Sequence, residues 1–266
     1  MPAAPLPDTL ESLRRTVAGI QGLEEISKDS QSVSFGIPAL DTVLGGGLPR
    51  GALHDLIPAA LLHLGAAMGF GLALAIRANE TAGRRAAKPV LWLQTDYARL
   101  EAGALYGPGF ERFGLPMKQL IVLRVPRAID ALWAMEEALR CRAVGTVITE
   151  LTNDDADLTA TRRLALAARD GGGIGLLLRH RSCMALSAAG TRWEIASAPG
   201  IRDDSYGGLG ATNFSLHLVK NRRGTCGRWN IRWDHHARTF TPAFPLGVAA
   251  TARDRSDRAR RLTRAG

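Results

Sequence analysis

Lysine is scarce in this chain of 266 residues. Only four of its 34 cationic residues are lysines, and the remainder are arginines. The four are Lys28, Lys88, Lys118 and Lys220. None of them follows a GxxxxG sequence, and none precedes a serine or threonine. Because a phosphate-binding loop needs that lysine and that hydroxyl group, the sequence excludes a phosphate loop of the known form. We therefore expect no ATP hydrolysis, no catalytic residues and no bound cofactor.

Cysteine is also rare, and long apolar runs are missing. Cys141, Cys183 and Cys226 lie far apart, with no CxxC pair and no histidine at metal-ligand spacing, so we expect free thiols and no metal site. No uncharged apolar run reaches the ~20 residues that a membrane span needs, and no secretory signal is visible at the N-terminus. These absences predict a cytoplasmic protein without a membrane partner.

Positive charge is concentrated near the C-terminus. The formal net charge is +9, and residues 251–266 carry six arginines against two aspartates. Such a tail suits an acidic partner or a phosphate backbone. A solvated tail that only aids solubility is an equally open interpretation. The candidate contact residues are Arg253, Arg255, Arg258, Arg260, Arg261 and Arg264.

The hydrophobic pattern predicts three regions: residues 1–33, an N-terminal helix and linker; residues 34–244, a folded core; and residues 245–266, a basic and disordered tail. Within the first region, Asp8–Glu25 has apolar residues at helical spacing.

Short apolar runs alternate with helical stretches in the core, which predicts an α/β fold with a mainly parallel sheet and helices on both faces. A Gly-containing loop, Asn221–Gly227, joins two further strands and predicts a final antiparallel hairpin. For α-helix Ala128–Arg140 we expect Ile129 and Trp133 on the apolar face and Glu136 turned outward. The expected parallel strands are Leu53–Ile57, Val90–Gln94, Leu120–Val125, Gly145–Leu151 and Ile174–Arg179, the hairpin strands are Phe214–Lys220 and Arg228–Trp233, and the other expected helices are Leu61–Ala78 and Leu158–Ala168.

The segment after the first parallel strand is where a nucleotide-binding protein of this class keeps its glycine-rich loop. Here Pro58–Gly71 contains no lysine, serine or threonine. We interpret Gly65, Gly69 and Gly71 as positions of tight helix packing.

Two motifs resemble those of a RecA-type core. The first is Ser34-Phe-Gly-Ile-Pro-Ala-Leu-Asp-Thr-Val-Leu-Gly-Gly-Gly-Leu-Pro-Arg-Gly51, and the second is Val219-Lys-Asn-Arg-Arg-Gly224. Together with the missing phosphate loop and a Thr191-Arg192-Trp193 element, they resemble the ImuA family of inducible mutagenesis proteins. The resemblance spans about Ser34 to Phe240.

That resemblance implies a non-catalytic member of the SOS-inducible, error-prone translesion synthesis complex. The implied partners are the polymerase-like protein ImuB, an error-prone paralogue of the replicative polymerase, and RecA. We expect the N-terminal helix and the basic tail to make the partner contacts. A division inhibitor finds no independent support in the sequence.

The resemblance also places two carboxylates where RecA-like proteins carry catalytic and magnesium-associated residues. Asp96 ends the second predicted strand and Glu150 ends the fourth. Without a phosphate loop, we interpret both as relics. A divergent RecA-like NTPase that depends on Asp96 or Glu150 is the alternative.

A DNA-binding recombination or repair accessory is a further alternative. The segments where RecA places its DNA-contacting loops, Asn153–Asp157 and Arg181–Ala189, are short here, so direct DNA binding is only weakly indicated. The basic hairpin loop could contact phosphates or could be a solvated turn, and its cations are Lys220, Arg222, Arg223 and Arg228.

Overall fold

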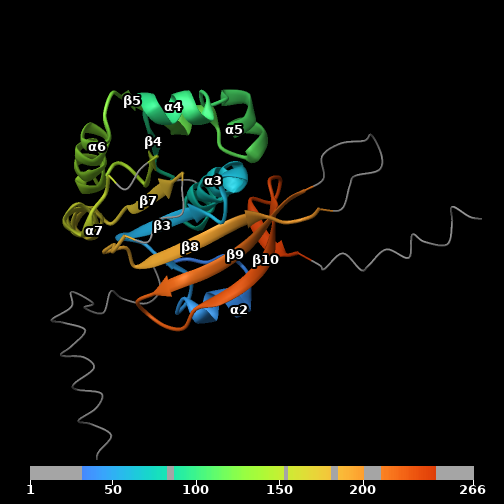
Figure 1. Cartoon of the computed structure of the whole chain (residues 1–266). Coiled ribbons are helices and arrows are strands. Elements are labelled where there is room, and N and C mark those ends of the chain that lie inside the picture. The colour runs from blue at the N-terminus through green and yellow to red at the C-terminus, as the bar shows by residue number, and fades with distance from the viewer. Residues whose placement is uncertain (1–31, 83–86, 153–154, 181–184, 201–210, 244–266) are drawn as a thin grey trace, which may run out of the picture.

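The computed structural model describes residues 32–82, 87–152, 155–180, 185–200 and 211–243 (Figure 1). Its centre is a nine-stranded sheet with the order β11-β10-β9-β8-β3-β7-β6-β4-β5. The strands are β3 (Ala52–Pro58), β4 (Val90–Thr95), β5 (Leu120–Val125), β6 (Thr146–Leu151), β7 (Ile174–Arg179), β8 (Thr191–Ser197), β9 (Thr212–Asn221), β10 (Gly227–Asp234) and β11 (Thr239–Pro242).

The strands from β8 to β5 are parallel, and β9, β10 and β11 add to β8 as an antiparallel set. The predicted α/β class, its mainly parallel sheet and its final hairpin are therefore confirmed. A small two-stranded ribbon, β1 (Ser32–Val33) with β2 (Leu48–Pro49), precedes the main sheet. The described helices are α2 (Pro38–Val43), α3 (Leu64–Ala82), α4 (Asp96–Ala102), α5 (Gly107–Phe113), α6 (Ala128–Arg140) and α7 (Leu158–Gly171), with 3-10 turns η1 (Leu61–His63) and η2 (Met117–Gln119).

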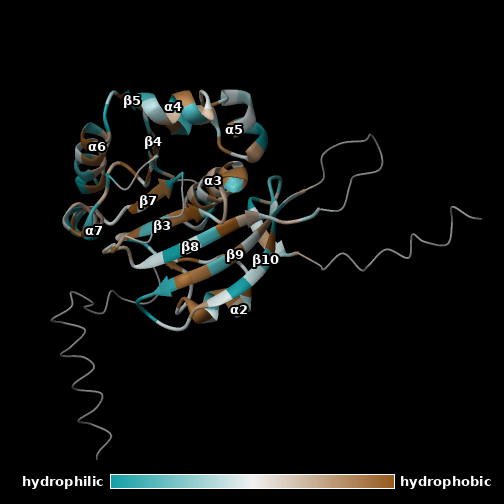
Figure 2. Cartoon of the chain, in the orientation of Figure 1, coloured by the Kyte–Doolittle hydropathy of each residue, from teal (hydrophilic) through white to brown (hydrophobic). Residues whose placement is uncertain are grey.

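The two faces of the sheet form two hydrophobic cores. Helix α3 packs in the larger core, and α6 and α7 cover the other face. Figure 2 shows hydrophobic residues concentrated in α3 and the strands beside it. Burial on both faces explains why the central strands read as continuous apolar runs.

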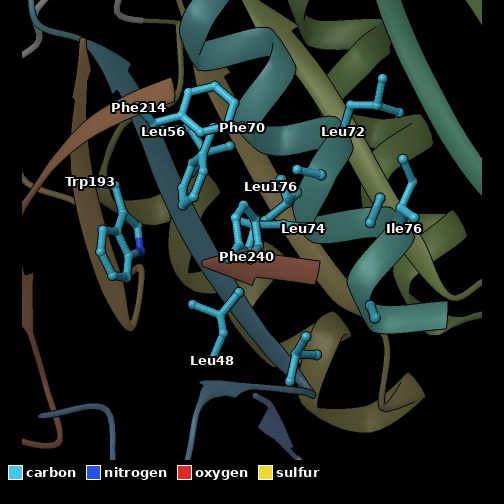
Figure 3. Packing of buried hydrophobic residues seen from close by; sticks show 14 of the residues in the cluster. Leu48, Leu56, Phe70, Leu72, Leu74, Ile76, Leu176, Trp193, Phe214 and Phe240 are labelled. Atoms are coloured by element: carbon cyan, nitrogen blue, oxygen red, sulfur yellow. The ribbon is translucent and has the colours of Figure 1, made fainter. Parts of the chain in front are cut away.

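Helix α3 supplies the centre of the larger core (Figure 3). Phe70 is fully buried, and its ring contacts those of Phe35, Trp193, Phe214 and Phe240 at centroid distances of 5.7–6.3 Å. The stretch Leu61–Ala82 is long and apolar enough to cross a membrane by length and composition alone. Half of that apolar stretch is buried inside the protein, which is typical of a core helix.

One strand was not predicted from the sequence, and two expectations about helix α6 were wrong. Strand β8 was missed, although Trp193 and Ile195 are buried and alternate with the partly exposed Arg192 and Glu194. In α6, Ile129 and Trp133 are exposed and Glu136 is buried. Glu136 turns inward because it pairs with Arg140 of its own helix and with Arg163 of α7, both at 2.6 Å.

The Leu-Asp turn of the first motif is built around the carboxylate of Asp41. This carboxylate accepts hydrogen bonds from the Ser34 hydroxyl, the Phe35 amide and the Gly36 amide, at 2.8–3.1 Å. Gly36 has a φ of 78°, a left-handed conformation that glycine adopts without strain. The motif therefore closes a turn in front of α2.

The triple glycine of the same motif makes the connection from α2 to β2. Gly45, Gly46 and Gly47 all have positive φ, and a Cβ on Gly47 would lie 2.5 Å from the Val33 carbonyl oxygen. Of the helix glycines, Gly71 is tightly packed, with Leu56 3.1 Å from its Cβ position. Gly65 faces open space, so the expectation of tight packing was wrong at that position.

The central strand β3 carries a buried histidine. The side chain of His54 is fully buried between the Thr191 hydroxyl, 2.8 Å from Nδ1, and the Pro49 carbonyl, 3.0 Å from Nε2. Burial lowers the pKa of His54 to about 4, because the charged imidazolium would lose its hydration.

The glycine geometry predicts opposite effects of two alanine substitutions. Gly47→Ala should lower the free energy of unfolding by about 2 kcal/mol or more, because of its positive φ and the clash with Val33. Gly65→Ala should raise it by up to about 1 kcal/mol, because alanine favours the helix and meets no atom. Urea unfolding of both variants measures the difference, and equal effects would contradict this account.

The buried histidine predicts a fall in stability at mildly acidic pH. The unfolded chain takes up a proton on His54 near pH 6.5, whereas the folded protein does so only near pH 4. The His54 contribution is therefore fully present above pH 6.5 and is lost as the pH falls toward 4, by about 3 kcal/mol at most. Urea unfolding at several pH values between 6.5 and 4 gives the free energy of unfolding as a function of pH. This free energy should fall less steeply with decreasing pH for His54→Gln than for the unsubstituted chain. Parallel pH profiles would refute the assignment.

Candidate functional site

The position of the phosphate loop, at the carboxyl end of β3, is closed by contacts within the protein. The first N–H group after the strand, that of Ala59, donates to the Ile195 carbonyl at 2.8 Å. His63 Nδ1 accepts from the Ser197 amide at 3.2 Å and lies 3.0 Å from the Ser197 hydroxyl. This segment is thus bonded to β8 through the Ala59 amide and the His63 side chain.

The short turn η1 in this segment presents apolar side chains to solvent. Leu61 and Leu62 are both exposed, at the place where a phosphate loop would offer a lysine and a hydroxyl group. Neither side chain can donate a hydrogen bond or carry a positive charge. The described segment therefore has no group that would neutralise a triphosphate.

Glu150, at the end of β6, is completely buried and is held by protein donors. Trp92 Nε1 donates to one carboxylate oxygen at 2.5 Å, and Gln94 Nε2 lies 3.3 Å from both oxygens. His180 Nε2 lies 3.2 Å from the second oxygen. This arrangement joins β4, β6 and the residue after β7, and it leaves the carboxylate no face toward solvent.

Asp96 lies in a different setting from Glu150. It opens helix α4, whose first turn is capped by the Thr95 hydroxyl accepting from the Ala98 amide at 3.1 Å. Its carboxylate pairs with Arg124 at the end of β5, and both side chains are about half exposed. The two residues line an open pocket together with Arg99, Leu100 and Ala104. Among the described residues, Asp96 and Glu150 share no hydrogen-bond or ion-pair partner.

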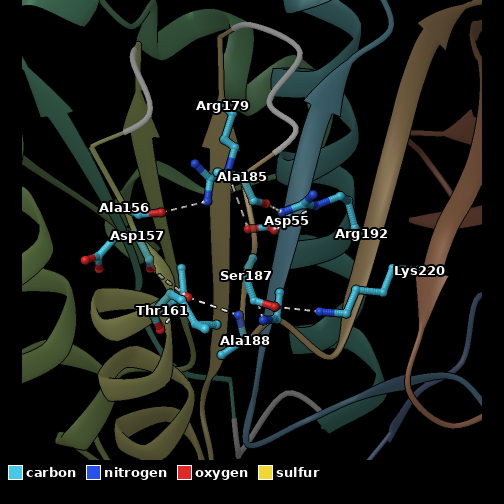
Figure 4. A network of polar contacts seen from close by, with 12 residues as sticks. Asp55, Ala156, Asp157, Thr161, Arg179, Ala185, Ser187, Ala188, Arg192 and Lys220 are labelled. Atoms are coloured by element: carbon cyan, nitrogen blue, oxygen red, sulfur yellow. Dashed lines mark hydrogen bonds and ion pairs between the residues drawn. The ribbon is translucent and has the colours of Figure 1, made fainter.

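The Thr-Arg-Trp element enters a buried ionic network (Figure 4). Arg192 donates to the carboxylate of Asp55 at 2.9 and 3.1 Å and to the Ala185 carbonyl at 2.8 Å. Arg179 lies on the other side, with its Nε 3.6 Å from the same carboxylate. Asp55 and Arg179 are fully buried, and buried charges of this kind need one another.

This network was not predicted from the sequence. The clue to this network in the sequence is a charged residue, Asp55, within the buried apolar run of β3. That position requires a buried partner, but the sequence does not say which arginine supplies it. The partners of Glu150 (Trp92, Gln94 and His180) were missed for the same reason.

The hairpin cations divide into two groups. Lys220 points inward and donates to the Ser187 carbonyl at 2.6 Å, and desolvation lowers its pKa (Figure 4). Arg222, Arg223 and Arg228 are exposed in and beside the loop between β9 and β10. Lys220 thus has a structural contact, whereas the three arginines remain accessible.

Other predicted sites lie outside the described residues. These are the N-terminal helix and the six tail arginines, Arg253, Arg255, Arg258, Arg260, Arg261 and Arg264. Of the cysteines, Cys141 and Cys226 are free and exposed, and Cys183 also lies outside the described part. Within the described ranges, no three His, Cys, Asp or Glu side chains gather as metal ligands would.

The fold and this site define an α/β protein with a nine-stranded, mainly parallel sheet, in which the segment after β3 holds neither a lysine nor a hydroxyl residue. A scan of known protein families matched none of their models. The chain is 32% identical over 212 residues to Protein ImuA of Caulobacter vibrioides strain NA1000 / CB15N, and equally to that of strain ATCC 19089 / CIP 103742 / CB 15. The match covers 75% of this chain and 82% of each relative. The chain belongs to the ImuA family.

The different settings of the two carboxylates predict different effects on stability. Glu150→Ala leaves the buried donors of Trp92, Gln94 and His180 without their acceptor, so the free energy of unfolding should fall by about 2 kcal/mol or more. Asp96→Ala removes only an exposed ion pair and should cost less than about 1 kcal/mol. Chemical denaturation of both variants compares them. Equal losses would show that Glu150 is not the structural anchor described here.

Proposed function

We propose that this chain is a non-catalytic scaffold of the SOS-inducible, error-prone translesion synthesis complex, in which it binds the polymerase-like protein ImuB. Membership of the ImuA family supports its part in inducible mutagenesis. The observation that carries the non-catalytic role is the segment after β3, where Ala59 and His63 are bonded to β8 and two leucines face solvent.

The chemistry of nucleotide hydrolysis supports the same proposal. A phosphate site needs convergent N–H donors, a cation and a metal ligand. After β3, the N–H group of Ala59 is already bonded to β8, and the exposed side chains of Leu61 and Leu62 are apolar. The carboxylate of Glu150 is already bonded to Trp92, Gln94 and His180. These groups therefore supply none of the phosphate contacts that stabilise a bound nucleotide in an NTPase.

Partner contacts are assigned to the segments on either side of the core. Residues 1–26 include the predicted amphipathic helix, and residues 251–266 hold the cluster of arginines. An apolar helix face and a basic tail suit a protein partner with an apolar groove and an acidic surface. The error-prone replicative-type polymerase and RecA are further proposed partners.

A DNA-binding accessory is the second candidate, and the exposed arginines of the hairpin loop favour it. Arg222, Arg223 and Arg228 are accessible, and with the tail they could contact a phosphate backbone. Because each phosphate contact releases counterions, about four contacts would give a log–log salt slope of roughly −3.6. A flat salt dependence would remove this candidate.

The proposal predicts a complex that forms without nucleotide. Full-length protein and ImuB from the same organism should co-purify in the absence of ATP, and removal of residues 251–266 or of residues 1–26 should weaken capture. A variant with Asp96→Asn is the matched control and should retain full capture. Capture that survives both truncations would refute the assignment of contacts.

Calorimetry separates the scaffold from the divergent NTPase. Titration of the purified chain with Mg-ATP up to about millimolar concentration should release no binding heat. A dissociation constant too weak for this titration to detect, above about 1 mM, corresponds to a binding free energy of less than about 4 kcal/mol. Binding that disappears in Asp96→Ala or Glu150→Gln would support the NTPase instead.

A further inference from the structure

The nine-stranded sheet ends in two edges of unlike character. Strand β11 is short, with Thr239 and Thr241 partly exposed, and it ends at the exposed Pro242, which has no N–H group to donate. Short length, polarity and proline are devices that prevent an edge from pairing with another chain. Strand β5, at the opposite edge, has none of these features (Figure 1).

Strand β5 combines apolar side chains with unbonded backbone groups. Ile121, Val122 and Leu123 are 49%, 49% and 40% exposed. The strand pairs with β4 on one side, and no other described backbone group bonds to it. Every second residue of such a strand therefore presents its N–H and C=O outward, which is the template for strand addition.

The charges beside this edge are compensated locally. Arg124 pairs with Asp96, and Arg127 just beyond the strand makes two bonds of 2.9 Å to Asp130. The chain as a whole has a net charge of +9, which would oppose the approach of a second copy. At β5 the paired carboxylates reduce that repulsion, so two copies of this edge are electrostatically compatible.

The sequence of β5 is also self-complementary in an antiparallel arrangement. Since opposite residues must lie on the same face, a twofold axis normal to the sheet has to pass through a residue and not between two residues. With the axis at Val122, Val122 faces itself and Ile121 faces Leu123 of the second copy. All three exposed apolar side chains then meet apolar partners, and the Arg124 residues lie opposite Leu120 and not opposite each other.

We propose that the β5 edge is a homodimer interface, in which two copies of this chain pair antiparallel about Val122 into one continuous sheet. Main-chain hydrogen bonds supply the affinity, and the pairs Val122–Val122 and Ile121–Leu123 fix the register. The proposal does not depend on the proposed scaffold role. The dimer would carry two copies of any partner-binding segment.

Charge placed at the axis tests the interface in the full-length protein. The unsubstituted chain should sediment with twice its monomer mass at tens of micromolar. Val122→Asp and Val122→Lys should each sediment as monomers, because they set like charges directly opposite each other. An equimolar mixture of the two variants should recover the dimer mass. Val219→Asp, on the interior strand β9 and also partly exposed, is the matched control and should remain dimeric.

Cross-linking tests the register independently of these charges. In a background with Cys141→Ser, Cys183→Ser and Cys226→Ser, mild oxidation of Val122→Cys should give a disulfide-linked dimer, because opposite Cα atoms lie about 4.5–5.5 Å apart. Leu123→Cys is the control and should remain uncross-linked, because its counterpart lies diagonally across the axis.

Three results would overturn the proposal. The unsubstituted chain could sediment as a monomer, the mixture of Asp and Lys variants could stay monomeric while each is folded by circular dichroism, or Val122→Cys could cross-link no better than Leu123→Cys. If a charged variant fails to fold, the mass of the unsubstituted chain and the cysteine pair still decide the matter.

Discussion

The aromatic contacts around Phe70 hold together parts of the chain that are far apart in sequence. Phe35 comes from the turn before α2, Trp193 from β8, Phe214 from β9 and Phe240 from β11. A single buried side chain of α3 thus connects the first motif, the central sheet and the antiparallel extension. Helix α3 is apolar on almost every side, which is typical of a helix buried in a core.

Two buried carboxylates on the other parts of the sheet are compensated by partners within the protein. Glu150 is surrounded by three donors, and Asp55 lies between two arginines. Each carboxylate links strands that are neighbours in the sheet but separate in the chain. Such groups add less to stability than an apolar core would, but removing one partner is costly because a charge or donor is left buried alone. The carboxylates of Asp55 and Glu150 therefore have structural roles in this chain.

The sequence predicted the fold well where local pattern determines the structure. Four of the five predicted parallel strands are buried apolar runs, the fifth, β5, is an apolar run at the exposed edge, and the hairpin has a glycine-containing loop, so all of them are visible from spacing alone. Prediction from the sequence failed where contacts with residues distant in the chain determine the local structure. Glu136 is inward because Arg163 of α7 meets it, and Thr191–Ser197 forms a strand because β3 and β9 flank it. The candidate site shows the same contrast between local pattern and long-range contacts. The absence of a lysine is visible in the sequence, whereas the donors around Glu150 are not.

The closed state of Glu150 bears on how a nucleotide site could ever return to this fold. Inserting a lysine and a serine after β3 would restore the composition of a phosphate loop but not its surroundings. Ala59 and His63 would have to release β8, and Trp92, Gln94 and His180 would have to release the carboxylate. Releasing Glu150 would leave the buried donors of Trp92, Gln94 and His180 without their acceptor, so that change lowers stability before it adds binding. A nucleotide site in this fold therefore requires several of these contacts to change together.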